Sequence, residues 1–128
     1  MTNALLDTST VIASPDGLRL DPGDTAAISV LTIGELHAGV RLAADPGVRA
    51  QRQARLVAIQ DAFEPLPVDE PIAVAYGELL AVARSRGRTT KATDLLILAT
   101  AAATGRTLVT NDDAQASLAE LAGVPVRR

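Results

Sequence analysis

Residues 89–113 read TTKATDLLILATAAATGRTLVTNDD, and this stretch decides the fold. A long apolar run begins at the acid Asp94 and stops at Gly105, a pattern typical of a buried helix. The run 107–110 that follows predicts a short buried strand. Strands that alternate with helices are typical of a parallel sheet. The stretch therefore predicts an α/β protein with an acid near the start of a buried helix.

Four acidic positions lie in apolar surroundings. Asp7 ends the run 4–6, and Glu35 lies within an amphipathic helical pattern. Asp94 heads the run described above, and Asp112 follows the predicted strand. A carboxylate in such surroundings is costly unless it is paired or binds a metal. Each acid could instead have a purely structural role. Asp7 and Asp94 suit helix N-termini, where a carboxylate is favourable. Glu35 suits an exposed position, and Asp112 suits a turn.

Three of these acids fall at strand ends or helix starts, which a parallel α/β topology brings to one edge of the sheet. Carboxylates gathered there suit Mg²⁺ or Mn²⁺, which prefer oxygen ligands. Without a metal, some of them should titrate at raised pH because they repel one another. One ion can activate water and a second can stabilise the leaving oxygen of a phosphodiester. The acids therefore predict a metal site that needs no His, Cys or Lys.

Composition excludes several kinds of site. The 128-residue chain has no cysteine and one histidine, which excludes disulfides and thiolate zinc sites and disfavours a Ser-His-Asp triad. Aromatic residues make up 2%, too few for a set of rings that stack on single-stranded nucleic acid. A hydrophobic content of 48% predicts one folded domain over 1–128. With no basic leader and no apolar run near the ~20 residues of a membrane span, we expect a cytoplasmic protein.

Strands and helices alternate along the chain, which predicts a short-stranded, mostly parallel sheet with helices on both faces. We expect strands at 4–7, 27–29, 107–110 and 124–126, and an extended segment at 66–68. We expect helices at 31–42, 48–63, 71–86 and 113–121, one that starts at 91 or 92 and ends at 103, and a first helix whose N-cap lies within 8–10. The segment 14–24 is rich in Pro, Gly and Asp and predicts a loop.

Four motifs together resemble the PIN-domain family and, within it, the VapC-type toxins of bacterial toxin–antitoxin pairs. They are LLDTS at 5–9, ISVLTIGEL at 28–36, ATDLLILATA at 92–101 and TLVTNDD at 107–113. The resemblance covers nearly the whole chain and implies a three-layer α/β/α sandwich. It implies an endoribonuclease dependent on Mg²⁺ (or Mn²⁺), in which metal-activated water cuts RNA. It also implies a cognate antitoxin, a homodimer and a larger toxin–antitoxin complex.

The resemblance assigns catalytic and metal-binding roles to Asp7, Glu35, Asp94 and Asp112. Asp113 is the alternative fourth acid, because it stands directly beside Asp112. Many family members carry an aromatic soon after this acid, whereas Ala114 and Gln115 follow here, so we expect a different local turn. Three hydroxyls would support metal-bound waters, substrate or carboxylates, or would serve as caps: Thr8, Ser9 and Thr110.

Basic residues cluster just before Asp94, and we expect them to hold RNA phosphates beside the site. They are Arg84, Arg86, Arg88 and Lys91. The alternative is an ordinary charged helix end. Other polar and aromatic positions suit surface or packing roles. We expect Arg49, Arg52 and Arg55 to lie on a solvated helix face and His37 to lie at the surface or an interface. We expect Phe63 and Tyr76 to be core or interface anchors. From the family's general habit, we expect the antitoxin to lie across the helices at 31–63.

Two other enzyme and signalling classes fit less well. A receiver-type phosphorelay domain would place its acidic pair after the first strand and a lysine after the last, whereas Lys91 is the only lysine here. A haloacid-type phosphatase would need two aspartates that bracket one residue, which the segment 7–9 lacks. A non-catalytic PIN-like module that binds RNA or a partner protein remains the alternative to the nuclease.

Overall fold

The computed structural model of the chain describes residues 1–13 and 20–128. Within this part, four short strands form one sheet in the order β2-β1-β3-β4, and every neighbouring pair is parallel. The strands are β1 (Asn3–Leu6), β2 (Thr25–Ala27), β3 (Thr107–Val109) and β4 (Val126–Arg127). The prediction of a short-stranded parallel sheet is therefore confirmed.

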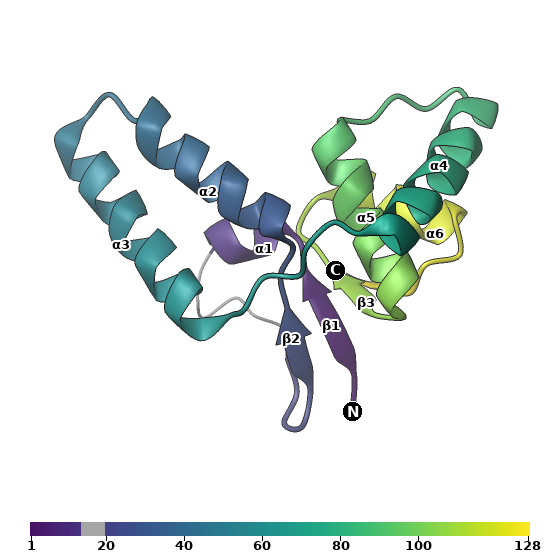
Figure 1. Ribbon diagram of the computed structural model, residues 1–128, viewed down its shortest axis with the longest axis horizontal. Helices are drawn as coiled ribbons and strands as arrows, with labels where there is room; N and C mark the ends of the chain where they lie inside the picture. The colour runs from purple at the N-terminus through teal and green to yellow at the C-terminus, as the bar shows by residue number, and fades with distance from the viewer. Residues whose placement is uncertain (14–19) are drawn as a thin grey trace.

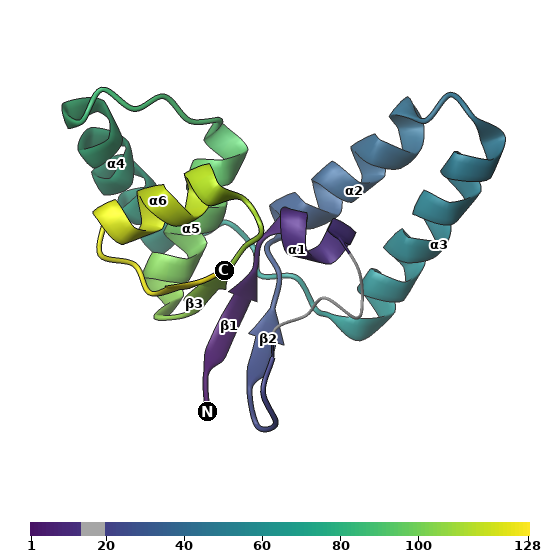
Figure 2. The same ribbon diagram turned by 180° about the vertical axis from the view of Figure 1, so that it is seen from behind.

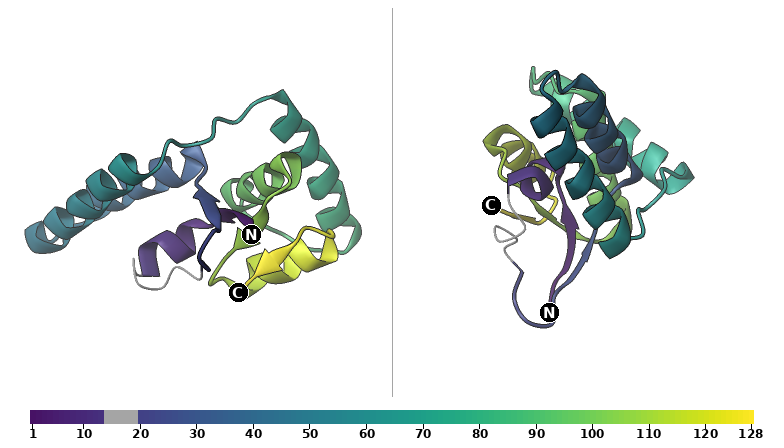
Figure 3. Two further views of the ribbon diagram at one scale, coloured as in Figure 1. Left: turned by 90° about the horizontal axis from the view of Figure 1, so that it is seen from below. Right: turned by 90° about the vertical axis from the view of Figure 1, so that its left-hand side faces the viewer.

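Helices cover both faces of this sheet (Figure 1). The helices are α1 (Thr8–Ala13), α2 (Val30–Leu42), α3 (Pro46–Ala62), α4 (Glu70–Ser85), α5 (Ala92–Thr104) and α6 (Asp113–Leu121). The view from behind shows α1, α2 and α3 together on one side of the strands and α4, α5 and α6 on the other (Figure 2). The same separation is visible from below, where the sheet lies between the two groups (Figure 3).

The two faces of the sheet carry separate apolar clusters, because side chains alternate along each strand. Leu5 and Leu108 pack with α4, α5 and α6, whereas Leu6 and Val109 pack with α1, α2 and α3. Phe63 and Tyr76 are partly buried against these clusters, as expected for packing anchors. The predicted three-layer α/β/α sandwich is confirmed.

Helix α5, which carries Asp94, is anchored deeply in the core. Leu95, Ile97 and Leu98 are at most 1% exposed, so the helix is held by apolar packing on the sheet. Gly105 ends the helix in the left-handed conformation, with φ 65°, which glycine adopts without steric cost. The start of α5 is thus fixed in position relative to the edge of the sheet.

The second strand ends two residues earlier than the sequence predicts. Ser29 does not extend β2; its hydroxyl accepts a hydrogen bond from the Leu31 N–H at 3.1 Å and caps α2. Ser29 also pairs with Leu66 in a single parallel bridge, so the expected extended segment at 66–68 is shorter than predicted. A serine side chain that bonds to a nearby backbone N–H favours the start of a helix over continued strand pairing.

The third helix begins two residues before the expected Val48. Asp45 lies between the predicted helices at 31–42 and 48–63, and its carboxylate accepts from the Val48 N–H at 2.9 Å and caps α3. Pro46 stands at the first helical position, where its missing N–H costs nothing. The other boundaries agree with prediction within two residues. Of the predicted loop at 14–24, the part at 14–19 lies outside the described residues.

In the described part of the chain, none of the helices combines the length and the apolar character that crossing a bilayer would require.

Candidate functional site

Asp7 follows β1 directly and lies at the carboxyl edge of the sheet. It is 4% exposed, and its Oδ2 accepts hydrogen bonds from Ser9 Oγ at 2.8 Å and Thr110 Oγ1 at 2.7 Å. Thr110 in turn accepts from the backbone N–H of Asp112 at 3.0 Å. The backbone carbonyl of Asp7 accepts from the Thr10 N–H, so its main chain starts α1 while its carboxylate binds hydroxyls. These contacts hold the segment after β3 against the segment after β1.

The hydroxyl of Thr8 orients the carboxylate of Glu35. The sequence predicts an N-cap within 8–10, whereas Thr8 is already the first residue of α1 and its Oγ1 donates to Glu35 Oε1 at 2.9 Å. Thr8 Oγ1 also lies 2.9 Å from Thr32 Oγ1. Because the single hydroxyl proton of Thr8 goes to Glu35, Thr32 is the donor in this second bond. A chain of two buried hydroxyls thus links α2, α1 and the half-buried Glu35.

Asp94 does not cap its helix. The N-cap of α5 is Lys91, which makes no side-chain capping bond, and Asp94 lies in the first turn. Burial raises the pKa of the Asp94 carboxyl above its ordinary value of 3.8, and the charges of Asp7 and Glu35 raise it further. Lys91 lowers this pKa and Asp112 raises it. The three other acids are therefore close enough to act on Asp94 electrostatically.

The two aspartates after β3 point to different surroundings. Asp112 caps α6, and its Oδ1 accepts from the N–H groups of Ala114 at 2.9 Å and Gln115 at 3.2 Å. The side chain of Asp113 is 95% exposed and lies 3.5 Å from the Nε of Arg128. Asp112, unlike Asp113, acts on the pKa of Asp94. Of this pair, Asp112 is the neighbour of the other acids.

A small hollow of about 180 Å³ adjoins Asp94 and Asp112, and two cations line it. Lys91 is exposed there, whereas the Arg88 guanidinium is held against α6 by bonds to Ser117 Oγ and the Ala114 carbonyl, both at 3.1 Å. The two other basic residues of the predicted cluster, Arg84 and Arg86, are exposed at the end of α4 and do not line this hollow. The structure thus brings half of the cluster to the acids.

Two buried contacts of the site, which Gln115 and Thr32 make, were not predicted from the sequence. Gln115 is 4% exposed, and its Nε2 donates to the backbone carbonyl of Asp94 at 2.7 Å, which ties α6 to the first turn of α5. Thr32, which is fully buried, supports Thr8 as described. Thr32 precedes Glu35 by three residues and so shares its helix face, a spacing that was visible in the sequence.

The four carboxylates are neighbours, yet they do not converge. Among the described residues, no group of three or more His, Cys, Asp or Glu side chains is arranged so that it could hold a metal ion. Repulsion between like charges favours such spacing. The set nevertheless offers only hard oxygen donors. After burial, the negative charges of Asp7, Glu35 and Asp112 raise the pKa of Asp94, and a divalent cation would neutralise that charge. The donor chemistry therefore fits Mg²⁺ or Mn²⁺.

Loss of the Asp94 charge should stabilise the metal-free protein. Because the pKa of Asp94 is higher in the folded than in the unfolded chain, ionisation of this group disfavours the fold as pH rises above 3.8. In a chelator at neutral pH, we expect Asp94→Asn to melt at a higher temperature than the unsubstituted protein. The difference should shrink as the pH is lowered toward 3.8. Circular dichroism melts across this pH range measure the effect.

The matched control is Asp113→Asn, which removes the same charge from a side chain that is 95% exposed. An exposed ion pair contributes little, so this variant should melt close to the unsubstituted protein at every pH. Equal melting temperatures for Asp94→Asn and the control at neutral pH would refute the role of burial and repulsion at Asp94.

Together, the fold and the site define an α/β protein whose acidic centre lies at the carboxyl edge of a parallel sheet. The sequence model of the PIN domain matches residues 4–121. The ribonuclease VapC5 of Mycobacterium tuberculosis is 39% identical over 127 residues, which are 97% of this chain and 93% of the relative. The chain belongs to the PIN-domain family and, within it, to the VapC group, as the motifs predicted.

Solved structures agree with this assignment. The VapBC-5 toxin–antitoxin structure from Mycobacterium tuberculosis matches with a TM-score of 0.87 and 38% identity, covering 100% of this chain and 99% of that one. FitAcB from Neisseria gonorrhoeae matches with a TM-score of 0.75 and 29% identity, covering 98% and 96%. The similarity therefore extends over the whole fold in both cases.

Proposed function

We propose that this chain is a metal-dependent endoribonuclease, the toxin of a toxin–antitoxin pair, formed by a single nuclease domain over 1–128. The observation that carries the proposal is the gathering of acids at one edge of the sheet: Thr110 bonds both the Asp7 carboxylate and the Asp112 backbone, and Asp94 and Asp112 line one hollow. The charges of Asp7, Glu35 and Asp112, after burial, also raise the pKa of Asp94. Relatives of the chain carry the name ribonuclease VapC, which supports RNA as the substrate. Divalent cations held by such oxygen ligands can stabilise the attacking and leaving oxygens in phosphodiester hydrolysis.

The residues that would hold Mg²⁺, or Mn²⁺, are Asp7, Glu35, Asp94 and Asp112. A bound ion would lower the pKa of a water molecule and stabilise negative charge on phosphate oxygens. The exposure of Asp113 and its contact with Arg128 favour Asp112 as the fourth acid. We do not expect Asp113 to contribute.

The polar neighbours of these acids would act by orientation. Ser9 and Thr110 fix one oxygen of Asp7, and Thr8 fixes one oxygen of Glu35, so each carboxylate keeps its other oxygen for a ligand. Such outer contacts hold ligands in the geometry that a metal requires. We therefore assign Thr8, Ser9 and Thr110 to support of the carboxylates. We expect the basic side chains around the site, Lys91 and Arg88, to contact the substrate directly.

RNA phosphates would approach Asp94 along the hollow that Lys91 and Arg88 line. Lys91 is exposed there, so its ammonium can contact a phosphate directly. Arg88 is held by α6 and would contribute a fixed positive charge. We expect Arg84 and Arg86, which do not line the hollow, to contribute only to general attraction.

Thr8→Val should lower metal affinity or cleavage by about 10- to 100-fold, the usual cost of losing an outer contact to a metal ligand. The substitution keeps the shape of the side chain but removes the donor to Glu35 Oε1. Metal titration and cleavage assays measure the loss. Thr8→Ser retains the hydroxyl and should restore most of it. If Thr8→Val binds metal and cleaves normally, the hydroxyl does not orient Glu35.

The proposed partners are a cognate antitoxin, a second copy of the chain in a homodimer and a larger complex of both, in the cytoplasm. Structures of relatives described as toxin–antitoxin systems support the antitoxin. We place it across α2 and α3, because these helices expose Leu42, Val48 and Val57, which are 81%, 37% and 45% exposed. Exposed apolar surface often marks a protein-binding site.

Cleavage of RNA by the purified, antitoxin-free protein tests the proposal. Total cellular RNA is incubated with Mg²⁺, with Mn²⁺ or with a chelator, and the new ends are mapped by sequencing. Discrete cuts that require the metal are expected, and their positions would identify the substrate. A folded protein that binds RNA or antitoxin but makes no cut with either ion would favour the non-catalytic module.

A further inference from the structure

We propose that Arg55, together with Arg52, forms a second phosphate-binding site for the RNA strand, in a hollow on the Glu35 side of the acids. This inference rests on the proposed function, and it extends the substrate path beyond the hollow at Lys91. The chemical class of ligand is a phosphodiester of single-stranded RNA. The sequence had predicted only a solvated helix face for these arginines.

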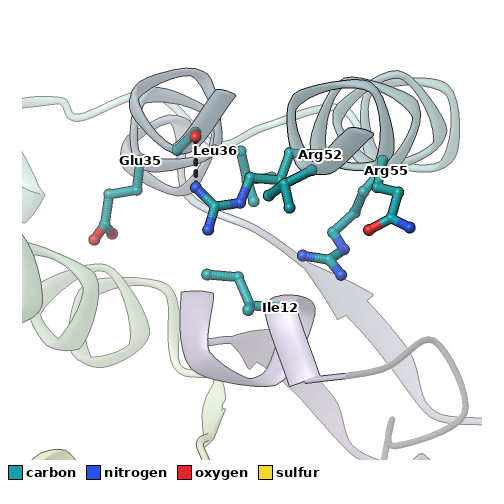
Figure 4. A pocket seen from close by; sticks show the side chains of 8 residues that line it. Ile12, Glu35, Leu36, Arg52 and Arg55 are labelled. Carbon is teal, nitrogen blue, oxygen red and sulfur yellow. Dashed lines mark hydrogen bonds between the residues drawn. The ribbon is translucent and has the colours of Figure 1, made fainter. Parts of the chain in front are cut away.

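The hollow has a volume of about 380 Å³ and lies between α1, α2 and α3. Arg52 and Arg55 reach into it from α3, and Ile12 approaches from α1 on the opposite wall (Figure 4). Glu35, one of the proposed metal ligands, lines the same hollow at its other end. A chain bound in this hollow would therefore run directly beside one of the proposed metal ligands.

The two guanidinium groups differ in how they are held. Arg52 Nη1 donates to the backbone carbonyl of Gly39 at 2.7 Å, so this side chain also fastens α3 to α2. Arg55 is half-buried, and among the described residues it has no hydrogen-bond or ion-pair partner. A partly desolvated guanidinium without a partner gains most from an anion that accepts two hydrogen bonds. Phosphate oxygens meet that requirement.

The acids then lie between two basic hollows. Asp94 and Asp112 adjoin the hollow with Arg88 and Lys91, while Glu35 adjoins the hollow with Arg52 and Arg55. RNA carries one phosphate per nucleotide, so a strand cut at the acids must extend on both sides of them. Cations on both sides match that charge pattern. The apolar side chains Ile12 and Val48 in the wall can contact ribose and base faces.

Salt dependence of RNA binding tests the inference, because loss of one phosphate contact makes the negative slope of log K against log salt shallower by about 0.7 for single strands. Binding is measured by fluorescence anisotropy with a random-sequence single-stranded RNA, in Mg²⁺, in the Asp94→Asn background to avoid cleavage. We expect Arg55→Gln to weaken binding roughly fivefold and to make the negative slope shallower by about 0.7. In the unsubstituted background, it should raise KM and leave kcat nearly unchanged.

Arg41→Gln is the matched control, because it removes the same charge from an exposed arginine of the same hairpin that does not line this hollow. It should leave the slope unchanged. An unchanged slope in Arg55→Gln, or equal changes in both variants, would overturn the inference. So would a defect in Arg55→Gln that affects an antitoxin peptide alone, since the hollow would then be a peptide site.

These outcomes separate the inference from the function on which it rests. If total RNA is not cleaved and the Asp94→Asn protein does not bind RNA, the proposed function itself fails. If the unsubstituted protein cleaves RNA and Arg55→Gln binds normally, only the second phosphate site is wrong.

Discussion

Asp94→Asn should lower metal-dependent RNA cleavage by more than about 100-fold, the largest effect on activity that we expect from a single isosteric change. The amide keeps the volume of the carboxyl group but loses the negative charge that would bind a cation. The charges of Asp7, Glu35 and Asp112 all act on Asp94, so its loss removes a proposed ligand that lies near the other three. Cleavage at the mapped sites, followed over time with excess Mg²⁺, measures the effect.

The fold should survive this change. Helix α5 starts without a side-chain cap, and the contact from Gln115 goes to the backbone carbonyl of Asp94, which the substitution retains. Circular dichroism should therefore match that of the unsubstituted protein. Asp113→Asn, on the exposed neighbour of Asp112, should cleave normally. Cleavage by Asp94→Asn within about tenfold of the unsubstituted rate would remove this residue from the metal site.

Leu98→Ala should reduce the free energy of unfolding by about 2–5 kcal/mol, the usual cost of a large-to-small change in a packed core. Leu98 is fully buried in α5, among side chains of α4, α6 and the sheet. The cavity left behind would loosen the helix that positions Asp94. Since small domains are stabilised by only about 5–15 kcal/mol, this one change would remove a large part of the total.

Urea unfolding of Leu98→Ala measures this loss. Leu42→Ala is its control, because Leu42 is 81% exposed and its truncation should change the free energy of unfolding by about 0.5 kcal/mol or less. If the two variants unfold at the same urea concentration, α5 does not anchor the core.

Much of the architecture could be predicted from the local pattern of residues. The apolar run after Asp94, the stop at Gly105 and the strand at 107–109 all lie where periodicity and turn chemistry place them. The predicted boundaries differ from the observed ones where a polar side chain can either cap a helix or lie in another element. Ser29 and Asp45 cap helices, although the sequence predicts Ser29 within a strand and Asp45 outside either neighbouring helix. Short-range pattern does not decide between such uses.

The sequence by itself determined which acids are candidates, because a carboxylate in apolar surroundings is conspicuous wherever it occurs. Only the tertiary structure decided how each acid is used. Asp94 is not a cap, Asp112 rather than Asp113 lies beside it, and the hydroxyls of Ser9 and Thr110 meet at Asp7 from positions 101 residues apart.

The physical reason is the range of the interactions. Helix and strand formation depend on neighbours within a few residues, which a linear pattern records. The direction of a side chain, its burial and its distant partners depend on how the layers pack. Three residues have roles that depend on this packing. Thr32 contacts α1, Gln115 contacts α5, and Arg55 lines the hollow beside Glu35.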